Sequence, residues 1–104
     1  MKNPRHILIT GASSGIGEAL ALHYAASNVV LFLCGRNADR VQSVKQACEQ
    51  KGATVYAEQI DVTNERQTAE WIKRCDAIAP LDLVIANAGV SAGPGDGTIE
   101  SAET

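Results

Sequence analysis

The chain has 104 residues, of which 45% are hydrophobic and 20% are charged, and its formal net charge is −3 at pH 7. This balance is typical of a globular protein and argues against a disordered one. Lysines and arginines are dispersed along the chain, which argues against a nucleic-acid partner. The longest unbroken apolar run, residues 29–34, is much too short for a membrane-spanning helix.

The cysteine pattern argues against both a disulfide framework and a zinc site. Cys34, Cys48 and Cys75 are widely spaced, odd in number, and form neither a CxxC pair nor a cluster with histidine. The first residues lead directly into a strand-like segment and leave no room for a signal peptide. We therefore expect a cytoplasmic protein that binds no metal and no membrane.

Short apolar runs alternate with longer amphipathic segments along the chain. The expected strands are residues 6–10, 29–34, 54–60 and 81–86; the expected helices are residues 15–27, a segment between Asn37 and Gly52, and a segment from Thr63 or Asn64 to Pro80. The second strand is apolar throughout, as a strand buried on both faces should be. This alternation predicts an α/β fold with a Rossmann-type parallel sheet and right-handed crossovers.

The helical period predicts which residues of each helix are buried. The expected buried positions are Ile16, Ala19, Leu20, His23 and Tyr24 in the first helix, Val41, Val44 and Cys48 in the second, and Thr68, Trp71, Ile72, Cys75, Ile78 and Ala79 in the third. Asn37 is the expected N-cap of the second helix, and the negative charge of Asp39 in its first turn would interact favourably with the helix dipole.

A glycine-rich turn lies between the first strand and the first helix, with the sequence Thr-Gly-Ala-Ser-Ser-Gly-Ile-Gly at residues 10–17. A dinucleotide pyrophosphate docks at such a turn, because bare backbone lets the phosphate approach and the helix N-terminus favours an anion. The candidate binding residues are Gly11, Ser13, Ser14, Gly15, Ile16 and Gly17. A P-loop is excluded because no lysine follows Gly15. The alternative is a turn that binds no ligand.

Arg36 indicates which dinucleotide is preferred. In a Rossmann unit, an acidic residue about 20 positions beyond the glycines binds the ribose hydroxyls of NAD, whereas an arginine there suits the 2′-phosphate of NADP. Arg36 lies nineteen positions after Gly17, and no acidic residue ends the second strand. NADP is therefore the expected cofactor, with NAD as the alternative. The competing interpretation is a solvated arginine in a surface turn.

Two further segments, taken with the glycine-rich turn, resemble the short-chain dehydrogenase/reductase family over nearly the whole chain. The turn itself is similar to the family's TGxxxGxG motif. Asp61 and Val62 are similar to the acid–hydrophobe pair that holds the adenine, and Asn87, Ala88 and Gly89 are similar to the family's NAG motif. The resemblance implies a sheet of order 3-2-1-4 with helices on both faces, an Asp61 carboxylate that accepts from the adenine amino group, and an Asn87 that steadies the central sheet.

Each of these segments has a purely structural interpretation when taken alone. Asp61 could simply start a helix, and Asn87 to Gly89 could simply be a turn that ends a strand. All of them follow the carboxyl ends of successive strands, however, which is where such sheets bind ligands. Their combination favours a cofactor site.

The chain departs from the family pattern in its catalytic residues. Family members use a serine and a YxxxK motif after the fifth strand, but here Tyr24 is followed four residues later by Asn28, and Tyr56 by Ile60. No catalytic residue is therefore assigned. We expect residues 1–104 to be the amino-terminal part of one Rossmann domain, truncated before the fifth strand, without its catalytic half and inactive alone.

Two functions remain open for this sequence. The first is the cofactor-binding part of an oxidoreductase that transfers hydride between NADP(H) and a carbonyl or alcohol substrate. The second is a non-catalytic, regulatory nucleotide-binding module. Because the expected fourth strand would leave an open sheet edge, we also expect a homo-oligomer. The segments that would shape a substrate pocket follow the fifth and sixth strands of the family, so the substrate class stays open.

Overall fold

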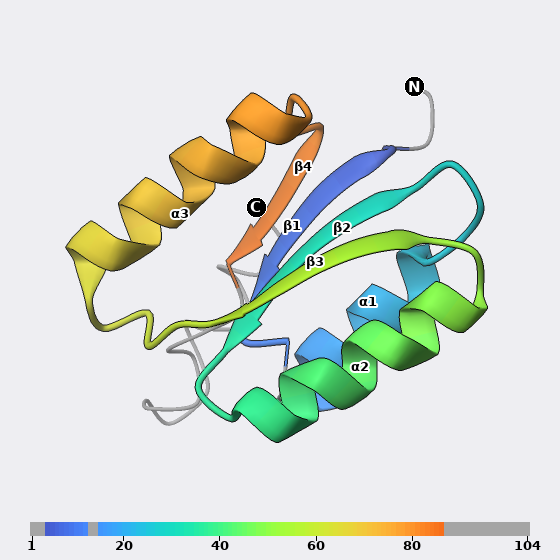
Figure 1. Cartoon of the computed structure of the whole chain (residues 1–104), viewed down its shortest axis with the longest axis horizontal. Helices are drawn as coiled ribbons and strands as arrows, with labels where there is room; N and C mark the ends of the chain where they lie inside the picture. The colour runs from blue at the N-terminus through green and yellow to red at the C-terminus, as the bar shows by residue number, and fades with distance from the viewer. Residues whose placement is uncertain (1–3, 13–14, 87–104) are drawn as a thin grey trace.

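The computed structural model describes residues 4–12 and 15–86, which form a parallel sheet with helices on both faces (Figure 1). The strands are β1 (His6–Thr10), β2 (Val30–Gly35), β3 (Thr54–Gln59) and β4 (Leu83–Ala86), and the helices are α1 (Gly15–Tyr24), α2 (Ala38–Gln50) and α3 (Glu65–Ile78). The strands pair in the order β3-β2-β1-β4, and all three pairings are parallel. The predicted Rossmann-type fold and strand order are confirmed.

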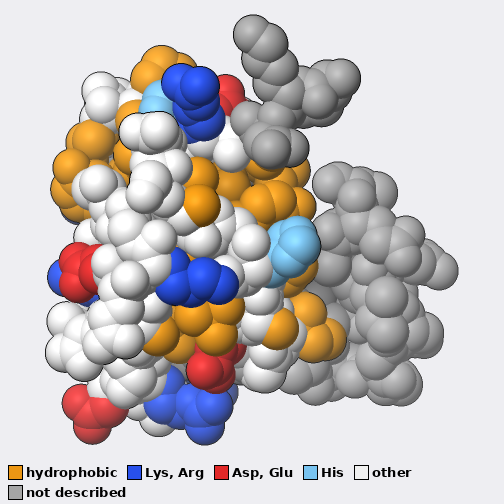
Figure 2. Space-filling view, turned by 90° about the vertical axis from the view of Figure 1, so that its right-hand side faces the viewer, with side chains coloured by type: hydrophobic (Ala, Val, Ile, Leu, Met, Phe, Trp, Pro, Cys, Tyr) orange, Lys and Arg blue, Asp and Glu red, His pale blue; other side chains and the backbone are white. Residues whose placement is uncertain are grey.

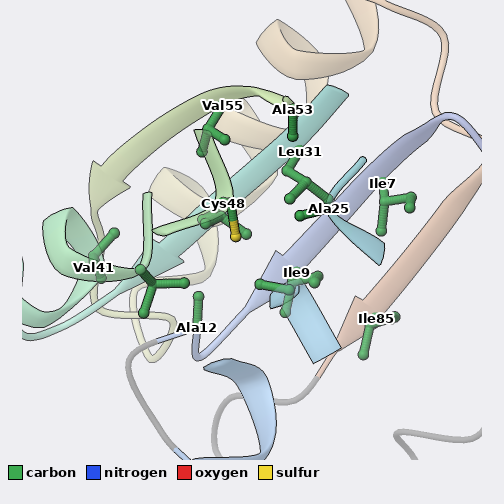
Figure 3. Packing of buried hydrophobic residues seen from close by; sticks show 13 residues of the cluster. Ile7, Ile9, Ala12, Ala25, Leu31, Val41, Cys48, Ala53, Val55 and Ile85 are labelled. Atoms are coloured by element: carbon green, nitrogen blue, oxygen red, sulfur yellow. The ribbon is translucent and has the colours of Figure 1, made fainter. Parts of the chain in front are cut away.

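The helices divide the core into two layers. Helices α1 and α2 cover one face of the sheet, and α3 covers the other (Figure 1). The core of the first face, which we call the α1/α2 face, consists of Ile7, Ile9, Ala12, Ala21, Ala25, Leu31, Leu33, Val41, Val44, Cys48, Ala53, Val55 and Ile85 (Figure 3). The core of the α3 face consists of Leu8, Phe32, Cys34, Ile60, Trp71, Cys75 and Ala79. Burial on both faces explains why β2 is apolar throughout.

Helix α1 is shorter than predicted and buries a different face. It ends at Tyr24 rather than at residue 27, and Asn28 adopts a positive φ of 73° in the turn that leads to β2. Gly17 and Ala21 are its buried residues, whereas Ile16, Ala19 and His23 are exposed, so these three predicted core positions were wrong. The reason is close packing: a Cβ at Gly17 would overlap the carbonyl oxygen of Gly11.

Helix α2 agrees with the prediction from its cap to its end. The side-chain oxygen of Asn37 accepts a hydrogen bond from the Arg40 N–H at 3.0 Å, as an N-cap does. The buried residues of the helix are Val41, Val44 and Cys48. Gly52 terminates it with a φ of 100°, a conformation that favours glycine.

Helix α3 begins at the second of the two predicted caps. The Asn64 side chain accepts from the Gln67 N–H at 3.0 Å, and Trp71 and Cys75 are buried against the sheet. Ile78, which was expected to be buried, is 55% exposed. It lies at the last residue of α3, and no other helix in the described part of the chain lies on this face to cover it.

Strand β4 begins at Leu83, two residues later than predicted, because the Leu81 N–H donates to the Asp76 side chain instead of to β1. Asp82 then joins β4 to the start of β1. Its Oδ2 accepts hydrogen bonds from the backbone N–H groups of Arg5 and His6 at 3.0 Å each. These two bonds lower the pKa of Asp82 below its ordinary value, and the bond from Arg5 contributes most. The Asp82 carboxylate therefore links the segment before β4 to the start of β1 at the amino-terminal end of the sheet.

The face of the molecule in Figure 2 shows no large area of one charge. Basic and acidic side chains are interspersed with apolar ones on the face in Figure 2. Among residues 4–12 and 15–86, no helix is both long and apolar enough to cross a membrane. Within the same residues, no group of three or more His, Cys, Asp or Glu side chains is placed to hold a metal ion.

Candidate functional site

The described candidate residues follow strands that end at the same edge of the sheet. All strands are parallel, so their carboxyl ends lie together (Figure 1). In register, Thr10 of β1 lies beside Cys34 of β2, and Gly35 of β2 lies beside Gln59 of β3. The segments that follow these strands are therefore neighbours, at the edge where parallel α/β sheets bind their ligands.

The glycine-rich turn is tied to the end of β2. Gly11 adopts a positive φ of 68°, which allows a sharp exit from β1, and the Ala12 N–H donates to the Cys34 carbonyl oxygen at 2.9 Å. Gly17 packs α1 directly onto the turn. Ser13 and Ser14, which were predicted to add hydroxyl donors, lie outside the described residues.

Gly15 and Ile16 begin α1 and are both exposed, Ile16 to 56%. Among the described residues, apart from the chain neighbours and the backbone of α1 itself, no atom lies within 4 Å of the position that a Cβ on Gly15 would take. The first turn of α1 therefore presents bare backbone at the positive end of the helix dipole. This geometry matches the requirement for a phosphate to approach closely.

Arg36 follows β2 directly, and its side chain is exposed. Its backbone is anchored from the neighbouring strand, because the Gln59 amide Nε2 donates to the Arg36 carbonyl oxygen at 3.0 Å. Gln59 was not among the residues predicted from the sequence. Its position as the last residue of β3, beside Gly35 in register, becomes visible only once the strands are paired.

Asp61 lies two residues beyond β3 and is held by its own turn. Its Oδ1 accepts from the Thr63 hydroxyl at 2.7 Å and from the Thr63 N–H at 3.0 Å. The Thr63 hydroxyl, then its N–H, and to a smaller extent the nearby Arg36 charge lower the pKa of Asp61. Asn64 is the N-cap of α3, so Asp61 lies in the turn that precedes the helix and does not cap it.

Val62 completes the pair predicted beside the adenine. It is partly buried and packs against the core of the α3 face. Asn87, Ala88 and Gly89 lie outside the described residues. The described part of β4 ends at Ala86, which lies beside Thr10 in register.

The cysteines offer no nucleophile to this site. Cys34 is fully buried on the α3 face, next to the glycine-rich turn. Burial raises the pKa of the Cys34 thiol to about 12 and that of Cys75 to about 11. Thiols of this kind stay protonated near neutral pH and are chemically inert. Cys48, which is also buried, has a raised pKa for the same reason.

The fold and the site together define a Rossmann-type α/β unit, with a glycine-rich turn on a helix N-terminus and polar side chains at the carboxyl edge of the sheet. The chain belongs to the short chain dehydrogenase family, whose model matches residues 5–103. It is 45% identical over 87 residues to an uncharacterized oxidoreductase of Myxococcus xanthus, and the match covers 83% of this chain and 34% of that protein. The resemblance predicted from the motifs is confirmed.

Other relatives and solved structures agree. The chain is 33% identical over 94 residues to chlorophyll(ide) b reductase NOL of Arabidopsis thaliana, covering 88% of this chain and 27% of that protein. It superposes on an alcohol dehydrogenase of the archaeon Thermococcus sibiricus, solved with 5-hydroxy-NADP, with a TM-score of 0.74 and 34% identity, covering 82% of this chain and 37% of that one. The chain spans about a third of the length of its curated relatives.

Proposed function

We propose that residues 1–104 are the amino-terminal part of a single Rossmann domain that binds NADP(H). The whole protein would transfer hydride between NADP(H) and a carbonyl or alcohol substrate. The proposed cofactor-binding residues are Gly11, Ser13, Ser14, Gly15, Ile16, Gly17, Arg36, Asp61, Val62, Asn87, Ala88 and Gly89. Membership of the short chain dehydrogenase family supports a dinucleotide cofactor and oxidoreductase chemistry.

The start of α1 is the proposed pyrophosphate site. Gly15 leaves its backbone open, and the positive end of the helix dipole attracts an anion. Gly17 has a different function, since it lets α1 approach the turn. The two glycines therefore serve the ligand and the fold respectively.

The exposed position of Arg36 is the main support for NADP rather than NAD as the cofactor. It is an exposed cation at the carboxyl end of β2, where a Rossmann fold places the adenosine ribose. A guanidinium can bind a phosphate through two hydrogen bonds, which an ammonium cannot match. The similarity to an alcohol dehydrogenase solved with an NADP derivative also supports this choice.

In this proposal the 104 residues bind and orient the cofactor, which supplies the hydride chemistry. Neither tyrosine has a lysine four residues later. Tyr56 is instead stacked on Phe32 at a ring-centroid distance of 5.3 Å. We therefore expect residues 1–104 to bind dinucleotide without turning over a substrate, which is also how a regulatory nucleotide-binding module would behave.

We also propose a cytoplasmic location and self-association. All three cysteines are free and buried, which is typical of proteins in a reducing compartment.

In the described sheet, β4 pairs with one neighbour, β1, and its Val84 is 42% exposed. An open strand edge with an apolar side chain beside it favours pairing with another chain.

The Arg36→Ala variant tests the cofactor assignment. Removing a charge-assisted hydrogen bond to phosphate should weaken NADP⁺ binding by about 1.5–3 kcal/mol, roughly tenfold to a hundredfold, and leave NAD⁺ binding nearly unchanged. Titration calorimetry with both dinucleotides measures this ratio. Arg74→Ala is a matched control, because Arg74 is also exposed but pairs with Glu58 at 3.2 Å. Equal affinity of the unmodified chain for the two dinucleotides would contradict the assignment.

A further inference from the structure

We propose that Thr63 is a positioning residue for base recognition: its hydroxyl orients the Asp61 carboxylate so that the dinucleotide site selects adenine over hypoxanthine. The inference rests on the proposed dinucleotide function. It adds a residue that the glycine, arginine and aspartate motifs did not identify. Thr63 contacts the base only through Asp61, so it is not itself a ligand-binding residue.

The hydrogen bonds of Asp61 are unevenly divided between its two oxygens. Oδ1 accepts both from the Thr63 hydroxyl at 2.7 Å and from the Thr63 N–H at 3.0 Å. Within residues 4–12 and 15–86, Oδ2 accepts no hydrogen bond. The two donors on Oδ1 fix the orientation of the carboxylate plane. Oδ2 then points in a fixed direction and can accept a hydrogen bond from a ligand.

The Thr63 hydroxyl is not required to start α3. Asn64 is the N-cap of that helix and binds the Gln67 N–H through its own side chain. Loss of the hydroxyl would also leave the N–H bond from Thr63 to Asp61 in place. The hydroxyl therefore has one visible consequence, which is the direction of the Asp61 carboxylate.

An oriented carboxylate discriminates between bases by their hydrogen-bonding groups. Adenine carries an exocyclic amino group that can donate to Oδ2, whereas hypoxanthine carries a carbonyl at the same position, which a carboxylate repels. Hydrogen bonds to a charged acceptor are stronger than neutral ones. Asp61 is exposed, so its carboxylate can reach a base at the sheet edge.

The test compares NADP⁺ with its hypoxanthine analogue in direct binding titrations. The unmodified chain should prefer NADP⁺. Thr63→Val should reduce that preference about three- to tenfold, as expected for one lost hydrogen bond, while Thr63→Ser should retain it. Thr68→Val is the matched control, because the Thr68 hydroxyl donates to the Asn64 carbonyl oxygen at 3.0 Å rather than to a carboxylate.

A double-mutant cycle separates positioning from turn stability. If Thr63 acts through Asp61, then Thr63→Val should not change base preference further in an Asp61→Ala background, which has no side-chain acceptor for Thr63 to orient. An equal loss of affinity for both bases in Thr63→Val, or an unchanged base preference, overturns the inference and leaves the proposed function standing if Arg36 still controls NADP⁺ preference. Failure of the unmodified chain to bind any dinucleotide overturns both. Circular dichroism verifies that each variant is folded.

Discussion

Two helices cover one face of the sheet, whereas a single helix covers the other in the described part of the chain (Figure 1). Among the described residues, the α1/α2 face buries thirteen core residues and the α3 face seven. On the α3 face, Tyr56 lies beside Phe32 and Val84 lies beside Leu8, and these two outer residues are 44% and 42% exposed. A sheet with apolar residues on both faces needs cover on both, so within the described residues we expect the α3 face to be less stable and more open to association than the α1/α2 face.

The two faces also reach their packing by different means. On the α1/α2 face, Gly17 and Ala21 let the helix approach the sheet closely. On the α3 face, the bulky Trp71 fills the space beneath the helix and is 3% exposed. Close backbone approach is intolerant of added atoms, whereas a face with one helix can relax around a removed side chain.

The largest expected effect is a difference between two buried leucines on opposite faces. Leu31 and Leu8 are both fully buried, the first on the α1/α2 face and the second on the α3 face. Leu31→Ala should lower the free energy of unfolding by about 4–5 kcal/mol, and Leu8→Ala by only about 2–3 kcal/mol, because the open face can collapse or admit water. Urea denaturation, followed by the fluorescence of the single tryptophan, measures both. Equal losses would mean that the two faces are equally closed.

A smaller effect should separate the two glycines of the turn. Gly17→Ala forces a Cβ against the Gly11 carbonyl and should destabilise the α1/α2 face by about 1–3 kcal/mol. Gly15→Ala adds a Cβ that contacts no packed segment among the described residues, so it should change stability by less than about 0.5 kcal/mol. It should weaken dinucleotide binding. Thermal melts and NADP⁺ titrations distinguish the two variants. A stable Gly17→Ala protein would show that α1 can move away from the turn.

The smallest expected effect concerns association through the open α3 face. The melting midpoint should fall by a few degrees over a hundredfold dilution, because folding and association are linked. Val84→Lys should remove most of this dependence by placing a charge on the β4 edge. Ala19→Lys, on the exposed side of α1, adds the same charge elsewhere and should leave the concentration dependence of the melting midpoint unchanged. A midpoint that is independent of concentration in the unmodified chain would argue against self-association.

Much of this architecture was predictable because its signals are local. The β1 strand, the Asn37 cap and the end of the second helix before Gly52 each depend on a few neighbouring residues, and all three were found where expected. The grouping of the glycine-rich turn, Arg36 and Asp61 at one sheet edge also followed from the order of the elements, since parallel strands place their carboxyl ends together.

The sequence by itself determined the type and order of the elements and the loops that carry the candidate site, because hydrophobic period, caps and turn residues act over a few positions. Only the tertiary structure decided which face of α1 is buried, since close approach to the Gly11 backbone selects Gly17 and Ala21 over the larger Ile16. It also decided that Gln59 anchors Arg36 across two strands and that Thr63 holds one oxygen of Asp61. These contacts depend on distances between backbone segments, which periodicity does not encode.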